Sequence, residues 1–182
     1  MMNLYMVILG CNLPNRHIEQ HDVFFSIGAD LLSLKQSMYD FWPEAGERLH
    51  IDSYREVSRV GNYEIRIFER GKGFMQNELN LYFLNLGGYK PNDMEEYHYK
   101  QLVVAKSIEE AIATATENTF YNHHCEPHVD NKYGIDVDDI YLVSDILPIH
   151  IRDKYSLHLV KSDSPSIADD PVIGYIKLTD WN

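Results

Sequence analysis

Glutamate and histidine recur with the same spacing at two places in the chain. One residue separates Glu19 from His21, and one residue separates Glu96 from His98. Residues spaced by two share a face of an extended segment, so each pair would present a carboxylate beside an imidazole, with His17 extending the first set. This combination suits zinc, manganese or iron, or a general acid–base pair. The alternative is that each pair holds its own loop through hydrogen bonds.

A second group of ligand-type side chains lies in the segment HHCEPHVD, residues 123–130. A Cys-x-x-His pair alone supplies only half of a zinc site, and no Cys-x-x-Cys pair accompanies it. The competing interpretation places the histidines at a helix C-terminus, where they interact favourably with the helix dipole. A metal bound in this segment would use His123, His124, Cys125, His128 and Asp130.

Glycines near the Glu–His pairs predict turns. Gly10 ends one apolar run, and Gly87 and Gly88 end another. Successive backbone N–H groups in such a turn could bind an anion, although the pattern is neither a P-loop nor a dinucleotide fingerprint. A plain turn is the alternative. The cationic and imidazole side chains close to these turns in sequence are Arg16, His17 and Lys90.

The Glu–His pairs belong to a longer internal repeat. Residues 4–21 (LYMVILGCNLPNRHIEQH) align without a gap with residues 81–98 (LYFLNLGGYKPNDMEEYH), with 8 identities in 18 positions. The tripeptide HID at 50–52 also corresponds to HVD at 128–130, shifted by one residue. Such self-similarity predicts a duplicated supersecondary unit whose copies pack about a pseudo-two-fold axis.

Each repeat is predicted to read strand–strand–helix–strand, which makes the chain an α+β protein. The helix of the first repeat begins after Asp30 and ends before Pro43, and that of the second begins at the capping box SIEE and continues to about residue 120. Weaker strands are expected near Ile51 and Val129. The main strands are expected at 4–9, 22–27 and 63–68, and at 81–86, 100–105 and 140–146.

The repeats predict the domain organisation. Repeat 1 occupies residues 1–72, a connector 73–80, repeat 2 residues 81–150 and a C-terminal extension residues 151–182, all within one compact body. Two strand-like segments in the extension, 156–160 and 172–178, predict a β-hairpin-like tail that closes a sheet edge.

Composition excludes several classes of partner. The chain has 182 residues, with 28 Asp and Glu against 16 Lys and Arg, a net charge of −12. It therefore lacks the basic surface that nucleic acids or anionic membranes require. The apolar start up to Cys11 has no preceding Lys or Arg and recurs at 81–88, so it is interpreted as a strand and not as a signal peptide. Residence in the cytoplasm is expected.

These motifs resemble a bacterial family catalogued as domain of unknown function 1543. The resemblance covers residues 1–150 and implies duplication and cytoplasmic residence, but no activity. The first copy departs from the second at Cys11, where the second copy has another glycine. The matching residues are Gly10, Glu19, His21, His50 and Asp52 in one copy, and Gly87, Gly88, Glu96, His98, His128 and Asp130 in the other.

Two classes of function follow from the sequence. The first is a binding or regulatory protein with a small-molecule pocket between the repeats, whose ligand is an anionic metabolite or a nucleotide. The second is a metal-dependent hydrolytic enzyme that uses the Glu/His set. The first is favoured because the chain has no complete catalytic signature such as Gly-x-Ser-x-Gly. The sequence is compatible with a homodimer.

Overall fold

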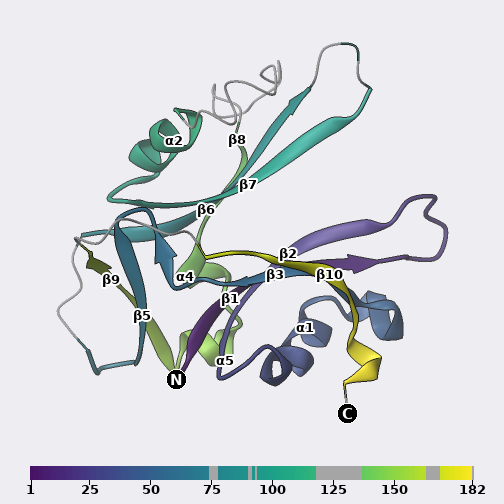
Figure 1. Ribbon diagram of the computed structural model, residues 1–182, viewed down its shortest axis with the longest axis horizontal. Helices are drawn as coiled ribbons and strands as arrows, with labels where there is room; N and C mark the ends of the chain where they lie inside the picture. Colours follow the sequence, from purple (N-terminus) through teal and green to yellow (C-terminus); the bar gives the residue numbers. More distant parts are fainter. Residues whose placement is uncertain (74–77, 90–91, 93, 118–136, 163–168, 182) are drawn as a thin grey trace. The chain divides into compact units, whose positions relative to one another are not determined.

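The computed structural model describes residues 1–73, 78–89, 92, 94–117, 137–162 and 169–181. The chain divides into two compact units (Figure 1). Unit 1 consists of residues 1–74 and 147–182, and unit 2 consists of residues 75–146. Unit 2 is therefore inserted between two segments of unit 1 in chain order.

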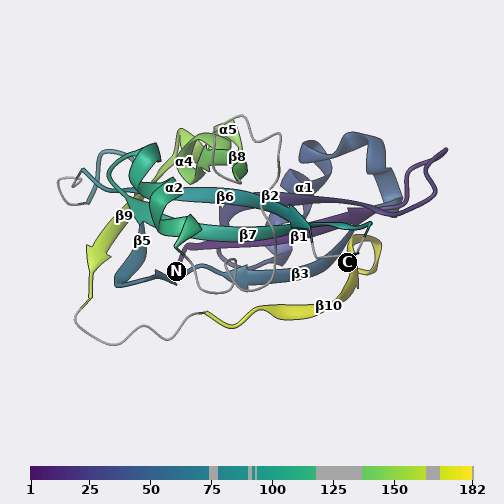
Figure 2. The same ribbon diagram turned by 90° about the horizontal axis from the view of Figure 1, so that it is seen from above.

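The main sheet of unit 1 has four antiparallel strands in the order β10-β3-β1-β2. The N-terminal apolar run forms β1 (Asn3–Cys11), between β2 (Gln20–Gly28) and β3 (His50–Glu56). A central strand is covered on both sides, which accounts for its nearly continuous apolar sequence. The edge strand β10 (Val172–Lys177) comes from the C-terminal segment and runs along β3 (Figure 2).

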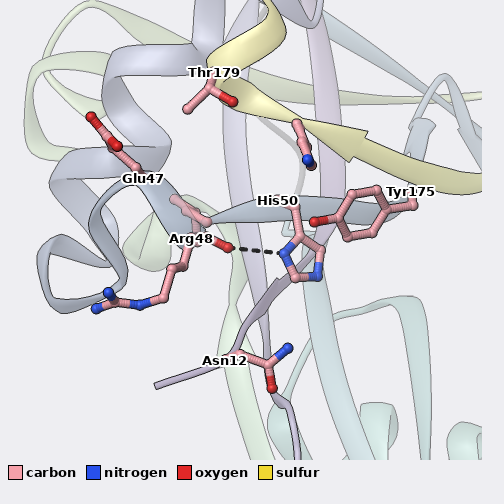
Figure 3. Close-up of a pocket in the computed structure, with 8 residues that line it drawn as sticks. Asn12, Glu47, Arg48, His50, Tyr175 and Thr179 are labelled. Atoms are coloured by element: carbon pink, nitrogen blue, oxygen red, sulfur yellow. Dashed lines mark hydrogen bonds between the residues drawn. The ribbon is translucent and has the colours of Figure 1, made fainter. Parts of the chain in front are cut away.

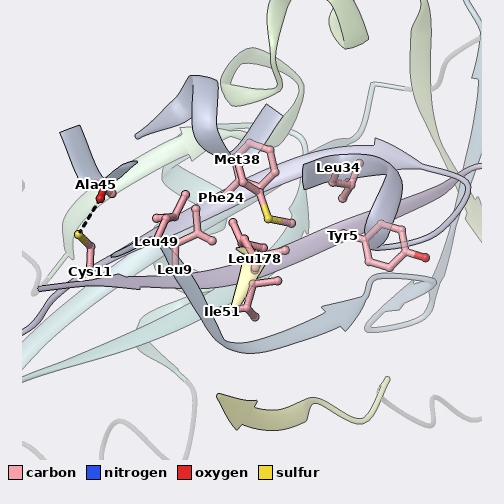
Figure 4. Close-up of a cluster of buried hydrophobic side chains, with 11 residues drawn as sticks. Tyr5, Leu9, Cys11, Phe24, Leu34, Met38, Ala45, Leu49, Ile51 and Leu178 are labelled. Carbon is pink, nitrogen blue, oxygen red and sulfur yellow. Dashed lines mark hydrogen bonds between the residues drawn. The ribbon is translucent and has the colours of Figure 1, made fainter. Parts of the chain in front are cut away.

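Short helices cover one face of this sheet. They are η1 (Leu32–Leu34), α1 (Lys35–Phe41) and η2 (Pro43–Arg48). The carboxylate of Asp30 accepts a hydrogen bond from the backbone N–H of Ser33 at 2.8 Å, which stabilises the turn that leads into η1, but the α-helix expected directly after Asp30 begins only at Lys35. The helices and the sheet enclose one buried cluster (Figure 4), which contains Tyr5, Val7, Leu9, Cys11, Phe24, Leu34, Met38, Ala45, Leu49, Ile51 and Leu178.

A second sheet of unit 1 has the strand order β4-β5-β9. It consists of β4 (Arg59–Val60), β5 (Tyr63–Glu69) and β9 (Tyr155–Lys161), and the short helix α5 (Ile149–Arg152) leads into β9. The carboxylate of Asp169 accepts hydrogen bonds from the backbone N–H groups of Ser58 and Arg59, at 2.7 and 2.9 Å. This contact fixes the start of the C-terminal segment against the loop after β3.

Unit 2 has a three-stranded antiparallel sheet in the order β7-β6-β8. Its elements are β6 (Asn80–Tyr89), β7 (Glu96–Ala105), α2 (Ile108–Thr116), β8 (Val137–Leu142) and α4 (Val143–Ile146). The predicted capping box is confirmed, since the Ser107 hydroxyl accepts from the backbone N–H of Glu110 at 3.2 Å. Apolar residues of α2, Ala111 and Ile112, pack on the sheet.

The mixed α+β class is confirmed, with mostly strands in three antiparallel sheets. Several details differ from the prediction. The strand expected at 140–146 ends at Leu142, where α4 begins. The hairpin-like tail is wrong, because β9 pairs with β5 and β10 pairs with β3. Ile51 lies in a full strand, β3, and Val129 lies outside the described residues.

The predicted glycine turns are also wrong. Gly10 lies inside β1, and Gly87 and Gly88 lie inside β6, so their backbones belong to sheet ladders. The chain reverses later, where Asn15 and Asn92 adopt positive φ angles of 64° and 62°. Asparagine tolerates this left-handed conformation better than most residues, which explains the recurring Asn of the Pro-Asn dipeptides.

Across the described parts of the chain, no helix has the length and apolar character needed to cross a membrane.

Candidate metal centre

Three adjacent strands of unit 1 bring two histidines into one row of the main sheet. Gly10 on β1 pairs with His21 on β2 and with His50 on β3. Paired residues of antiparallel strands point to the same face, so the two imidazoles flank the glycine. The neighbours of Gly10 in sequence, Leu9 and Cys11, belong to the core beneath the helices. The row therefore lies on the opposite face of the sheet.

A β-bulge adds a carboxylate to this row. The pairing of β3 with β1 shifts between Ile8 and Leu9, and Asp52 is the extra residue on β3. Bulges redirect side chains, and this one brings Asp52 to both histidines. Its Oδ2 lies 3.0 Å from Nε2 of His21, and its Oδ1 lies 3.4 Å from Nε2 of His50.

Glu19 supplies a second carboxylate from the residue just before β2. Its Oε1 lies 3.0 Å from Nε2 of His50, and its Oε2 lies 3.5 Å from Nε2 of His21. The side-chain amide of Asn12 donates a hydrogen bond to Oε1 of Glu19 at 3.1 Å, which orients the carboxylate. We call Glu19, His21, His50 and Asp52 the unit 1 cluster.

The hydrogen bond of His50 determines which ring nitrogen carries its proton. Nδ1 lies 3.0 Å from the backbone carbonyl oxygen of Arg48 (Figure 3). Because a carbonyl only accepts, Nδ1 must be the donor. In the neutral ring, Nε2 then has a lone pair. Nε2 is buried and makes no hydrogen bond with any described residue, and His50 is only 2% exposed.

This geometry places lone pairs against lone pairs. Nε2 of His50 faces oxygens of both Glu19 and Asp52, and Oδ2 of Asp52 is itself buried without a hydrogen bond to a described residue. Such an arrangement is repulsive unless a cation lies between the groups, either a second proton on the imidazole or a metal ion. Metal-bound histidines characteristically donate their other N–H to a carbonyl or carboxylate, as His50 does.

Gly10 provides the space in which these side chains meet. A Cβ atom at this position would lie 2.4 Å from Nε2 of His50 and 2.7 Å from Oδ2 of Asp52. Any larger residue would therefore push the cluster apart. The glycine is required for the close approach of the side chains, and not for a backbone turn.

Unit 2 contains a related cluster of three side chains. Nε2 of His98 lies 3.6 Å from Oε1 of Glu96 and 3.2 Å from Oδ2 of Asp138. Gly87 pairs with His98, and a Cβ atom on Gly87 would lie 2.4 Å from Oδ2 of Asp138. As in unit 1, the aspartate is the extra residue of a bulge in the third strand. We call these the unit 2 cluster; among the residues that the structure describes it has one histidine, where the unit 1 cluster has two.

The structure brings Glu19 to His21 and Glu96 to His98, as their spacing predicts. His17 does not join them, because residues 17 and 18 form a bend before β2 and the His17 side chain is exposed. Arg16 is also exposed. Lys90 and the whole 123–130 segment, with His123, His124, Cys125, His128 and Asp130, lie outside the described residues.

Sequence reasoning missed how the third strand contributes to each cluster. It identified His50 and Asp52 only as repeat matches, and it paired Asp52 with Asp130. In the structure, Asp138 occupies the bulge position that corresponds to Asp52. The segment between helix and third strand is longer in the second repeat, so an alignment that allowed only a one-residue shift could not find Asp138. The available signal was the acidic tripeptide at 137–139 (VDD), which begins β8.

A cavity of about 360 Å³ lies beside the unit 1 cluster and includes His50. The ring of Tyr175 lies 4.4 Å from the His50 ring, at an angle of 38° (Figure 3). This cavity belongs to unit 1, and the pocket expected between the repeats stays a prediction. The lining residues are Asn12, Glu47, Arg48, Leu49, His50, Tyr175, Lys177 and Thr179.

Residues 16–67 match the model of a family described as Domain of Unknown Function (DUF1543). The predicted family resemblance is confirmed. The match is narrower than the expected 1–150, but it contains all four residues of the unit 1 cluster. A duplication within the chain does not follow from this match.

A solved structure resembles the chain over almost its whole length. The crystal structure of a protein Il1583 from Idiomarina loihiensis aligns with a TM-score of 0.66 and 22% identity, covering 98% of this chain and 99% of that chain. At this identity the likeness establishes the fold alone. A search of curated proteins gave no match.

Proposed function

We propose that the chain binds a divalent transition-metal ion at the unit 1 cluster and uses this ion to bind a small anionic molecule. The observation that carries the proposal is the state of His50. Its proton is committed to the Arg48 carbonyl, and its buried Nε2 faces two carboxylates. A divalent cation between these groups converts their repulsion into ligation and compensates the two negative charges.

The spacing of the donor atoms supports this proposal. One atom each from Glu19, His50 and Asp52 lie within 4.8 Å of one another. Two donors bonded at about 2.0–2.2 Å to the same ion are at most about 4.4 Å apart, so small side-chain movements suffice. His21, which lies 3.0 Å from Asp52, adds a fourth ligand. Two imidazoles and two carboxylates suit zinc, manganese or iron.

Metal-dependent hydrolysis is the second candidate function. It is favoured by the partial exposure of three ligands, since the side chains of His21, Glu19 and Asp52 are 46%, 33% and 29% exposed. Water can therefore reach an ion held among them. A metal-bound water is far more acidic than bulk water and supplies hydroxide near neutral pH. The open side of the cluster distinguishes it from closed, structural zinc sites.

Metal titration of the chelator-treated chain by calorimetry tests the proposal. We expect wild-type protein to bind zinc or manganese at the unit 1 cluster, and His50→Gln and Asp52→Asn to lose that site. His158→Gln is the matched control, because His158 is also a buried histidine of unit 1 but bonds Ser156 at 3.0 Å. Equal metal binding by wild type and His50→Gln would overturn the proposal.

We also propose that the two units are copies of one ancestral unit. Supporting this, β2-β1-β3 and β7-β6-β8 have the same order, and the aspartate bulge falls at the same place in both. The expected superposition of residues 1–72 on 78–150 stays a prediction, as do the cytoplasmic location and the homodimer.

A further inference from the structure

We infer that the unit 2 cluster is a second cation site, and that it binds a divalent ion of the class that prefers oxygen ligands, with manganese as its representative. The inference goes beyond the proposed function, which concerns unit 1, and does not depend on it. It follows from three converging donor side chains, from the space that a glycine leaves for them, and from a buried amide oxygen on the same face of the sheet.

The three side chains of the unit 2 cluster already have the spacing of metal ligands. One atom each from Glu96, His98 and Asp138 lies within 4.8 Å of the others. Glu96 and His98 start from β7 and Asp138 starts from β8, and these two strands flank β6. Ligands bonded at about 2.0–2.2 Å to one ion are at most about 4.4 Å apart, so small side-chain movements would close the site.

The central strand β6 has no side chain at the point where these groups meet. Gly87 pairs with His98, and a Cβ atom on Gly87 would lie 2.4 Å from Oδ2 and 2.9 Å from Oδ1 of Asp138. A contact this close would displace the whole carboxylate, so Asp138 occupies space that only glycine leaves. Oδ2 of Asp138 thereby lies 3.2 Å from Nε2 of His98.

A buried acceptor belongs to the same face of the sheet. Asn85 precedes Gly87 by two residues on β6, so both face away from the core in which Leu86 packs beneath α2. The β-bulge on β8 falls between the partners of Asn85 and Leu86, and Asp138 is its extra residue. Oδ1 of Asn85 is buried and makes no hydrogen bond with any described residue. An acceptor in this state costs free energy unless a ligand supplies its partner.

The charges of the cluster require a cation that can serve several oxygens at once. Ionised Glu96 and Asp138 carry two negative charges, and both face Nε2 of His98. A protonated His98 compensates only one of these charges, and its Nε2 has a single N–H to donate. A divalent ion between the carboxylates compensates both charges, and it gives the Asn85 oxygen a partner, either directly or through a bound water.

The donor set of unit 2 is richer in oxygen than that of unit 1. In the internal alignment Asn85 takes the place of Ile8, and the described part of the cluster has one imidazole in place of two. Imidazole nitrogen suits zinc, whereas carboxylate and carbonyl oxygens suit manganese, magnesium and calcium. The side chains of Glu96, His98 and Asp138 are 37%, 37% and 23% exposed, which leaves access for the water molecules that such ions retain.

Manganese titration of the full chain, preloaded with one equivalent of zinc, tests the inference by electron paramagnetic resonance, because the signal of free manganese weakens when the ion binds. We expect one bound manganese ion per chain. Glu96→Gln and Asp138→Asn should each weaken its binding by more than about 10-fold, and Asn85→Leu by about 10-fold, the loss typical of an outer-shell partner.

Glu117→Gln is the matched control for these variants. It removes a carboxylate charge from unit 2 at the exposed end of α2, a helix that packs on the opposite face of the sheet. Manganese binding should be unchanged by this substitution. A zinc-loaded chain that binds no manganese, or equal binding by wild type, Glu96→Gln and Asp138→Asn, would overturn the inference.

Two further variants separate the sites and test the class of ion. The metal-free His50→Gln chain keeps the unit 2 cluster intact and should still bind manganese, while His98→Gln keeps the unit 1 cluster. The ratio of zinc affinity to manganese affinity should be lower for His50→Gln than for His98→Gln. Equal ratios would overturn the assignment of an oxygen-preferring ion. Absence of zinc from unit 1 would overturn the proposed function alone, since manganese binding by His50→Gln does not involve that site.

Discussion

At the scale of single residues, the proposed metal site depends on where one proton of His50 lies. His50 gives its Nδ1 proton to the backbone of Arg48, so only Nε2 remains for the two carboxylates. Glutamine at position 50 would be a poor replacement, because its amide oxygen binds zinc or iron more weakly than an imidazole nitrogen does. Gly10 matters for a different reason, because its lack of a side chain leaves the space in which the side chains of His50 and Asp52 meet.

Replacing Gly10 with alanine should separate the ligands without removing any of them. The new Cβ would lie 2.4 Å from Nε2 of His50, so the imidazole must move. We expect metal affinity to fall by at least about 10-fold, as for disturbed ligand positions elsewhere. Gly28→Ala is the control, since Gly28 ends β2 of the same sheet and its Cβ would crowd Ser33 and Leu34 of η1, away from the cluster. That variant should lose stability but keep the metal, and a Gly10→Ala variant with wild-type metal affinity would contradict the role of the glycine.

Cys11 should make the folded chain less stable at alkaline pH. The thiol is fully buried, and burial raises the pKa of Cys11. The unfolded chain therefore loses the thiol proton first, and the free energy of unfolding falls as pH rises above the ordinary thiol range, near about 8.5. Unfolding by urea from pH 7 to 10 should show a steeper loss for wild type than for Cys11→Ala. Parallel curves for the two proteins would rule out this contribution of the thiol.

At the scale of helices and strands, the sequence predicts the elements that depend on nearby residues, but it does not predict which distant strands pair. The strands at 4–9 and 81–86 and the capping box at Ser107 follow from short-range sequence signals, and the structure confirms them. The meeting of Glu19 with His50 depends on the register of β1, β2 and β3, which no local pattern specifies. The bulge that turns Asp52 toward the histidines is likewise a property of the paired strands.

The C-terminal segment shows the same limit. Its strands were predicted as a local hairpin, yet β10 pairs with β3, more than one hundred residues earlier in the chain. Leu178, just after β10, is fully buried in the core of unit 1 with Leu9 and Ile51. Because Leu178 is buried against residues of β1 and β3, the C-terminal segment is part of unit 1 and completes its core.

Truncation of Leu178 should therefore destabilise the chain strongly. Leu178→Ala removes a fully buried side chain, and we expect a loss of about 2–5 kcal/mol in the free energy of unfolding of unit 1. Ile173→Ala on β10 is the matched control, because Ile173 is 81% exposed and should change stability by less than about 0.5 kcal/mol. Similar losses for both variants, measured by urea unfolding, would show that Leu178 does not anchor the tail.

At the scale of the whole molecule, the described residues form a cluster of four side chains in unit 1 and one of three side chains in unit 2. An ion that binds only the folded state raises stability, by about 2.7 kcal/mol when its concentration is 100 times the dissociation constant. We expect zinc to raise the thermal midpoint of wild type and of Glu96→Gln, but to leave Glu19→Gln much less changed. These substitutions are matched, since each removes one carboxylate charge from one cluster. A larger loss of the zinc effect in Glu96→Gln would place the principal site in unit 2.

Anomalous diffraction from crystals grown with zinc would show whether a metal ion binds at the unit 1 cluster. We expect an anomalous peak at the zinc edge about 2.0–2.2 Å from Nε2 of His50 and from oxygens of Glu19 and Asp52. The peak should be absent from crystals of His50→Gln grown in the same solution. Wild-type crystals grown with the same excess of zinc, in which an imidazolium is hydrogen-bonded to the carboxylates and no anomalous peak lies between them, would rule out a metal ion at this cluster.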